Sequence, residues 1–161
     1  MLIRPFTPAD SVVVNSVALA AFAQYENIYS DWIVLIRGVG AMDALADSGE
    51  IFVADDDGEI VGAVAYIPPG ALPRADFFEA DWPIIRMLVV SPSARGRGIG
   101  RKLTEKCIEL ARRDKAEVIS LHTSPAMEVA LSLYLKMGFK LHRHVPDRFG
   151  MPYGVYLLNL L

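Results

Sequence analysis

Three patterns follow one another directly between residues 84 and 111, and together they constrain the fold more than any other feature. Ile84–Val90 is a nearly continuous apolar run, typical of a central strand that is buried on both faces. Pro92 ends this run, and the glycine-rich segment Arg95-Gly96-Arg97-Gly98-Ile99-Gly100 follows. Apolar residues then recur at helical spacing, at Leu103, Cys107, Leu110 and Ala111. We therefore expect a buried strand, a glycine-rich loop and an amphipathic helix in succession.

This arrangement suits the binding of a phosphate group. Glycines let the backbone approach a ligand closely and adopt positive φ angles. The first amides of a helix have no partner within the helix, and the helix dipole favours an anion in front of them. Four basic residues gather here in a chain of formal net charge −3, namely Arg95, Arg97, Arg101 and Lys102. We expect a pyrophosphate to bind at this loop, and a glycine-rich turn that only joins strand to helix is the alternative.

The spacing of the glycines narrows the choice of phosphate ligand. The fingerprint of dinucleotide-binding folds requires a third glycine at the position that Arg101 occupies here. No Gly-Lys-Ser/Thr follows the loop, as it would in a nucleoside triphosphate site. These two common motifs are therefore unsupported, although another kind of nucleotide-binding module remains an alternative.

Composition limits the class of protein. The chain has 161 residues, of which 53% are hydrophobic and 22% are charged, which excludes a disordered chain. We see no linker or repeat and expect one domain over residues 1–161. Cys107 is the only cysteine, and neither a signal peptide nor an apolar run of roughly 20 residues is present. We expect a cytoplasmic protein without a membrane partner. The sequence pI near 5.6 gives no reason to expect nucleic acid.

The periodicity along the chain predicts a mixed α/β fold. We expect one central, mostly antiparallel sheet of about six to seven strands, flanked by about four helices. Predicted helices begin at Thr7-Pro8, cover much of Asp31–Asp47, follow the glycine-rich loop, and span Ala126–Met137. Ala71–Pro83 is expected to be a loop or a short helix, and Pro146–Gly154 a turn-rich connection. The predicted strands are Leu2–Phe6, Glu50–Asp55, Glu59–Ile67, Ile84–Val90, Val118–His122, Phe139–Val145 and Val155–Leu160.

Two stretches of this sequence resemble the signatures of the GCN5-related N-acetyltransferase (GNAT) family. Val90-Ser91-Pro92-Ser93-Ala94-Arg95-Gly96-Arg97-Gly98-Ile99-Gly100-Arg101-Lys102-Leu103 is similar to the family's phosphate-loop signature, Arg/Gln-x-x-Gly-x-Gly/Ala after an apolar strand. Leu131-Ser132-Leu133-Tyr134-Leu135-Lys136-Met137-Gly138-Phe139 is similar to its second signature, a helix that ends Leu-Tyr-x-x-x-Gly-Phe. The two occur in the family's order, and the predicted elements match over nearly the whole chain. The resemblance implies the acyl-CoA N-acyltransferase fold.

The resemblance also implies a ligand and a role for each matching position. Acetyl-coenzyme A would be the co-substrate, held in a wedge between two splayed strands, and no metal would be needed. A backbone N–H near Val89 or Val90 would polarise the thioester, and Tyr134 would be the catalytic residue that protonates the departing thiolate. Residues Leu88, Val89 and Val90 would bind the pantetheine arm. The pyrophosphate would be bound by Arg95, Gly96, Arg97, Gly98, Ile99, Gly100 and Arg101.

Other polar residues are weaker candidates. Relatives carry a Glu on the strand before the loop and an Asn before the Tyr, whereas this chain has Pro83-Ile84-Ile85-Arg86-Met87 and Met127. The general base is therefore unassigned. Glu79, Asp81 or His122 would act as the base if its side chain reached the acceptor. We favour the alternatives, which are that Glu79 and Asp81 are solvated loop acids and that His122 is an ordinary hydrogen-bonded histidine. His142 and His144 are too few ligands for a metal site. Tyr25, Tyr29 and Trp32, together with Glu26, lie where the family builds its acceptor pocket. They would contact an acceptor, and an aromatic cluster that only packs under a loop is the alternative.

We therefore expect an acetyl-CoA-dependent N-acyltransferase that acts on a primary amine. The acceptor could be a small molecule or a peptide, and the sequence does not identify it. An exposed closing strand leaves a homodimer possible. The main alternative is a coenzyme A sensor that binds without catalysis.

Overall fold

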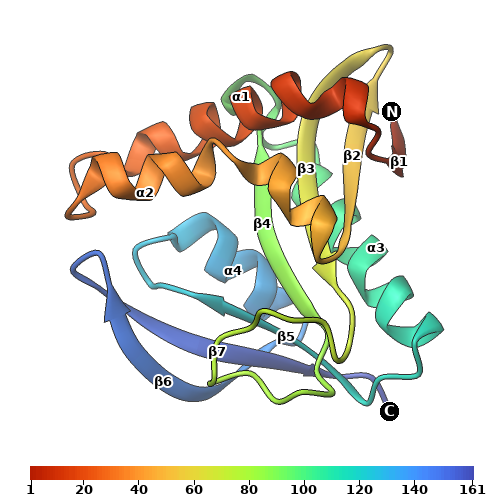
Figure 1. Cartoon of the computed structure of the whole chain (residues 1–161), viewed down its shortest axis with the longest axis vertical. Coiled ribbons are helices and arrows are strands. Elements are labelled where there is room, and N and C mark those ends of the chain that lie inside the picture. Colours follow the sequence, from red (N-terminus) through yellow and green to blue (C-terminus); the bar gives the residue numbers. More distant parts are fainter.

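Seven strands form one mixed sheet in the order β1-β2-β3-β4-β5-β7-β6 (Figure 1). The computed structural model describes all residues, Met1–Leu161. Every neighbouring pair is antiparallel except β4 and β5, which run parallel. The predicted fold class is thus confirmed. The strands are β1 (Leu2–Pro5), β2 (Glu50–Asp56), β3 (Glu59–Ile67), β4 (Ile84–Val90), β5 (Val118–Thr123), β6 (Lys140–Arg148) and β7 (Met151–Asn159).

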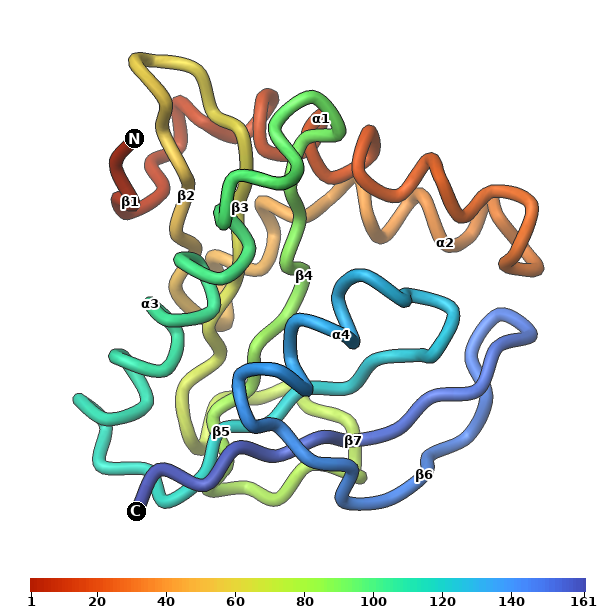
Figure 2. Tube along the Cα trace, turned by 180° about the vertical axis from the view of Figure 1, so that it is seen from behind, coloured from red at the N-terminus to blue at the C-terminus, as the bar shows by residue number.

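Four α-helices cover the two faces of this sheet. α1 (Ser11–Phe22) and α2 (Trp32–Val39) lie together on one face, and α3 (Ile99–Arg113) and α4 (Glu128–Lys136) lie on the other (Figures 1 and 2). Short 3-10 turns occur at Pro8–Asp10, Ala23–Tyr25, Met42–Asp47 and Pro92–Ala94. None of the helices combines the length and the apolar character that a bilayer crossing requires.

The alternation of side chains along β2 shows how the sheet divides two apolar cores. Ile51 and Val53 pack with α1 and the 42–47 segment, whereas Phe52 and Ala54 pack with α3 on the opposite face. Successive residues of a strand point to opposite faces, so one short strand contributes to both cores. A third, smaller apolar cluster lies under the 71–83 loop and includes Phe78.

β4 and β5 separate almost as soon as they meet. Ile84 pairs with Ser120, and no later residue of β4 has a partner on β5 (Figure 1). A bulge on the other edge of β4 places Met87 and Leu88 opposite the single residue Val64, and Met87 has a φ of 55°. The sheet therefore opens into a V, and the second half of β4 presents one free edge to the space between the strands.

Two sequence predictions need correction. β4 is not buried throughout: Arg86 is exposed and Leu88 is half-buried, because β5 has diverged from that part of the strand. Pro146–Gly154 is not a long turn, because β6 runs to Arg148 and β7 begins at Met151. Pro146 is tolerated within β6 because β6 is the edge strand of the sheet, where a missing amide costs no ladder hydrogen bond. In addition, α4 begins at Glu128, two residues later than predicted.

Candidate functional site

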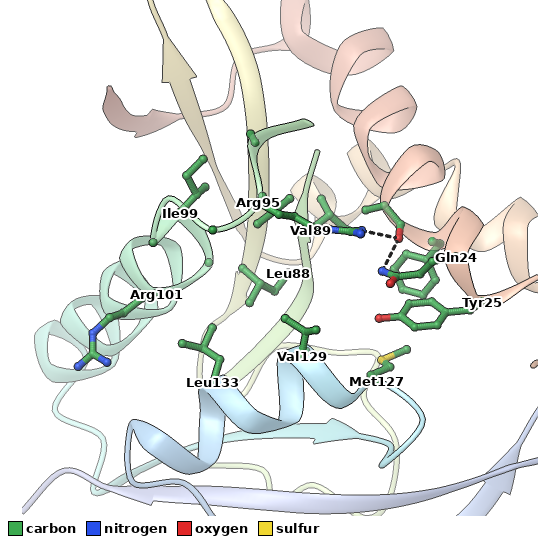
Figure 3. A pocket seen from close by; sticks show the side chains of 18 residues that line it. Gln24, Tyr25, Leu88, Val89, Arg95, Ile99, Arg101, Met127, Val129 and Leu133 are labelled. Atoms are coloured by element: carbon green, nitrogen blue, oxygen red, sulfur yellow. Dashed lines mark hydrogen bonds between the residues drawn. The ribbon is translucent and has the colours of Figure 1, made fainter. Parts of the chain in front are cut away.

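A cavity of about 260 Å³ lies where β4, the glycine-rich loop, α1 and α4 meet (Figure 3). We call it the loop cavity. The structure brings nearly all of the predicted coenzyme-binding residues to its wall, and Arg97 is the exception. The lining residues are Ala21, Phe22, Gln24, Tyr25, Leu88, Val89, Val90, Ala94, Arg95, Gly96, Gly98, Ile99, Gly100, Arg101, Met127, Val129, Ala130 and Leu133.

The loop presents its backbone amides without internal partners. Gly96 and Gly98 have φ angles of 80° and 75°, in the left-handed region where glycine is favoured. No backbone amide from Arg95 to Arg101 donates to a backbone carbonyl, and the helical pattern begins only when Lys102 donates to Gly98 at 3.1 Å. A run of free amides at a helix N-terminus is the physical basis of an anion site.

The arginines of the loop contribute less charge than the sequence indicates. Arg97 forms an ion pair with Asp56 at 2.8 Å, and Arg101 forms one with Glu105 at 3.0 Å. Figure 3 shows that Arg101 extends from α3 away from the centre of the cavity. The guanidinium of Arg95 donates instead to the Ala21 carbonyl at 3.3 Å, which also accepts from Gln24 at 3.0 Å. Backbone amides, more than free cations, therefore make up this site.

A second cavity, of about 360 Å³, lies between the splayed strands. We call it the wedge cavity. It shares Phe22, Leu88, Met127 and Ala130 with the loop cavity, so the two are adjacent along β4 and α4. Tyr134 lines the wedge cavity rather than the loop cavity. Two ligands could therefore enter from different sides and meet at the residues that the cavities share, Leu88 among them.

Tyr134 is packed in the core but has an accessible hydroxyl. The residue is 6% exposed, and its ring lies edge-on to Phe139 at a centroid distance of 5.6 Å. No fully enclosed side-chain oxygen or nitrogen of the structure lacks a hydrogen bond, and the Tyr134 hydroxyl makes none, so that hydroxyl faces the wedge cavity. Burial raises the pKa of Tyr134 well above its ordinary value, which keeps the phenol protonated at neutral pH.

The charged side chains at the wedge cavity are basic. Arg86 and Arg148 line it, together with His122, and no carboxylate lines either this cavity or the loop cavity. The Arg148 guanidinium donates to Nε2 of His122 at 2.9 Å, so this ring nitrogen is unprotonated. Burial lowers the pKa of His122 to about 4, and the charges of Arg148 and Arg86 act in the same direction. His122 is thus neutral, and Arg148 occupies its lone pair.

The remaining candidates lie outside these cavities or serve in packing. Glu79 approaches Arg143 at 3.9 Å, and neither Glu79 nor Asp81 lines a described cavity. The hydroxyls of Tyr29 and Tyr153 share a buried hydrogen bond of 2.9 Å. No group of three or more His, Cys, Asp or Glu side chains is arranged to hold a metal ion. Of the remaining aromatic group, Tyr25 lines the loop cavity, while Glu26 and Trp32 line neither cavity.

Sequence reasoning missed the basic pair of the wedge cavity. Arg86 has no role of its own in the sequence-based prediction, and Arg148 lies in a segment that is predicted to be a turn. Arg148 lies at the β6–β7 turn, opposite Met151, and its side chain reaches His122 of β5. An arginine inside an otherwise apolar strand was the available signal for Arg86.

Comparison with known proteins agrees with the geometry. The model of the acetyltransferase (GNAT) family matches residues 17–139. N-acetyltransferase 8B of Mus musculus is 36% identical over 89 residues, which cover 55% of this chain and 37% of that protein. N-alpha-acetyltransferase 30 of Saccharomyces cerevisiae is 42% identical over 55 residues, or 34% of this chain and 31% of that protein. The matches therefore span well under half of these relatives.

Solved structures share the fold over nearly the full chain. The ribosomal-protein-alanine N-acetyltransferase of Brucella melitensis has a TM-score of 0.72 at 24% identity, covering 99% of this chain and 100% of that one. The protein yncA of Salmonella typhimurium, solved with its cofactor acetyl-CoA, has a TM-score of 0.71 at 20% identity, covering 100% of this chain and 94% of that one. From the match of the family model to most of its length, this chain belongs to the GNAT family of acetyltransferases.

Proposed function

We propose that this protein transfers an acetyl group from acetyl-coenzyme A to a primary amine, by direct attack within a ternary complex. The observation that carries the proposal is the run of unpaired amides from Arg95 to Arg101 beside a cavity that continues into the wedge between β4 and β5. Family membership supports the transfer chemistry, and the related Salmonella typhimurium structure holds acetyl-CoA. Residues 1–161 would act as one domain.

The coenzyme would bind mainly through the backbone. The amides of the loop would hold the pyrophosphate, since a helix N-terminus attracts anions. Leu88, Val89 and Val90 lie on the β4 edge that β5 leaves free, and the amide-bearing pantetheine arm would add there like another strand. A methyl group on Gly100 would stand 3.3 Å from Leu133, so glycine here also permits the close contact of α3 and α4.

Tyr134 would complete the reaction. The amine nitrogen forms a bond to the thioester carbon, and a backbone N–H near Val89 or Val90 stabilises the oxyanion. The carbon–sulfur bond then breaks, the Tyr134 hydroxyl gives its proton to the departing thiolate, and the second proton that the attacking nitrogen loses returns to the Tyr134 phenolate through water. The burial that raises the phenol pKa raises the basicity of a thiolate in the same cavity too, so the two stay matched.

The basic wedge cavity offers a way to deprotonate the amine without a carboxylate. Only a neutral amine attacks, and a lysine-like amine has a pKa of about 10.4 in water. Nearby positive charges disfavour the ammonium form and lower that pKa. Arg86 and Arg148 would do this here, and the proton would leave through water.

The test is acetyl transfer by the purified protein. Acetyl-CoA binding would be measured by calorimetry, and release of free thiol would be followed with a panel of amines. We expect binding at micromolar levels and thiol release that depends on the amine. Failure to bind the coenzyme at millimolar concentration would refute the proposal, and binding without turnover on any amine would favour the sensor alternative.

A further inference from the structure

Arg86 and Arg148 form a pair of like charges without a counterion. Arg148 is hydrogen-bonded to His122, while Arg86 contributes to the lowered pKa of the same ring, so both lie around one imidazole. Neither arginine forms a salt bridge with any carboxylate, whereas six other basic side chains do: Arg4, Arg97, Arg101, Lys106, Arg113 and Arg143. Two close cations in a concave site repel each other unless an anion joins them.

The surroundings of this pair form a pocket for a ligand. Beyond the wedge cavity lies a third cavity of about 400 Å³, which we call the side cavity, beneath the 71–83 loop. Arg86, His122 and Arg148 line both cavities and thus lie at their junction. Phe77 and Phe78 form an apolar wall of the side cavity. Arg74, its other arginine without a carboxylate partner, donates four of its five N–H groups to the carbonyls of Pro68, Ala71, Glu79 and Trp82.

The guanidinium of Arg86 is free to take a ligand. It makes no hydrogen bond or ion pair in the protein, and although the residue as a whole is exposed, partial desolvation at the junction of the two cavities lowers its pKa and the neighbouring Arg148 lowers it further. Arg148 uses one nitrogen on His122, and its guanidinium lies 5.9 Å from the Tyr153 ring centroid, which holds it beside the wedge. Planar guanidinium groups match carboxylates in a two-bond geometry.

We propose that the acceptor is a small amine that also carries a carboxylate, such as an amino acid, bound through Arg86 and Arg148. This inference rests on the proposed acetyl transfer. Arg86 and Leu88 lie on either side of the bulged residue Met87 of β4, and both line the wedge cavity. A carboxylate at the arginines therefore leaves an amine on an adjacent carbon facing the Leu88 end, where the thioester would lie. The side cavity takes the rest of the molecule.

The experiment compares amines that differ only in the carboxylate. Each of the twenty amino acids is assayed beside its carboxamide with saturating acetyl-CoA. The amide has the less basic amine and so the larger neutral fraction, which makes it the better nucleophile in solution. We expect kcat/KM for the best amino acid to exceed that of its amide by about 100-fold, because the charge-assisted bonds are lost in the amide. O-phosphoethanolamine beside ethanolamine tests a phosphate instead.

Variants assign the preference to the two arginines. Arg86→Gln and Arg148→Gln should each raise KM for the amino acid about 10- to 100-fold more than KM for its amide, because only the amino acid loses a bound carboxylate, and should leave acetyl-CoA affinity unchanged. Arg86→Lys should recover part of the loss. Arg37→Gln removes a charge from an exposed arginine of α2 outside the cavities and is the matched control.

The outcomes separate this inference from the function on which it rests. Absence of acetyl-CoA binding would overturn both. Coenzyme binding with equal or better turnover of the amides, with preference for the phosphate, or with no turnover of any amino acid would overturn the carboxylate site alone. An equal KM rise for acid and amide in the arginine variants would reduce these residues to a structural role.

Discussion

The loop cavity and the wedge cavity are neighbours, yet they are built from different parts of the chain and by different means. The predicted anion site of the loop cavity is a short continuous segment, residues 95–101, and its polar groups are mainly backbone amides, in a loop that has positive φ angles at Gly96 and Gly98. The wedge cavity takes its polar groups from side chains of β4, β5, α4 and β6, which meet only after folding. The first therefore offers main-chain donors, whereas the second offers side-chain groups that a single substitution can remove.

The largest effect on catalysis should come from removing a single oxygen atom in the wedge cavity, the hydroxyl of Tyr134. Tyr134→Phe should lower kcat by about 100-fold, because general acid catalysis contributes on this scale, and should leave acetyl-CoA affinity nearly unchanged. Steady-state kinetics and calorimetry measure the two effects. Tyr156→Phe is the control, since Tyr156 lies in the same apolar core but lines neither cavity. Unchanged kcat in Tyr134→Phe would leave Tyr134 with a packing role only.

The wedge cavity should also respond to pH, whereas the loop amides do not titrate. The folded pKa of His122 is about 4, below the ordinary 6.5, so the unfolded chain binds the extra proton between these values. The contribution of His122 to stability is therefore fully present above about pH 6.5 and is lost as pH falls toward 4, by up to about 3 kcal/mol. Urea unfolding across this range and NMR titration of the ring measure it.

Two variants test this assignment. Arg148→Gln should raise the pKa of His122, because it removes both a positive charge and the donor that holds Nε2 unprotonated. His122→Gln should flatten the pH dependence between 4 and 6.5. An NMR pKa near 6.5 in the wild-type protein would show that the wedge is more hydrated than its burial implies.

Glycine substitution tests the claim that the loop cavity works through its backbone. Gly98→Ala places a side chain at a φ of 75°, and Gly58→Ala places one at 92° in the β2–β3 turn; neither new methyl group meets another atom within 4 Å. Both should lose about 1 kcal/mol of stability from the same strain. Only Gly98→Ala should weaken acetyl-CoA binding, by about 10-fold. Equal affinity in the two variants would contradict a backbone site.

The same contrast explains what could be predicted from the sequence. The loop was visible because its residues are consecutive and glycine marks positive φ, and the sheet was visible because residues such as Ile51 and Phe52 alternate between two cores. The Arg86–Arg148 pair was not visible, because it depends on the β6–β7 hairpin register and on the divergence of β5 from β4. Local composition at Pro146–Gly154 indicated a turn, and pairing with β7 overrode it.

The smallest effect on acetyl-CoA binding is expected from an arginine beside the glycine-rich segment, although its charge is prominent in the sequence. Arg101→Gln should weaken acetyl-CoA binding by less than about 3-fold, because Arg101 is paired with Glu105 and extends away from the cavity (Figure 3). The backbone amide of Arg101, which the substitution keeps, would do the binding. Calorimetry at low and high salt measures this, with Glu105→Gln as the partner control. A loss of 10-fold or more would mean that the guanidinium turns to the pyrophosphate when the coenzyme binds, and that charge as well as backbone holds it.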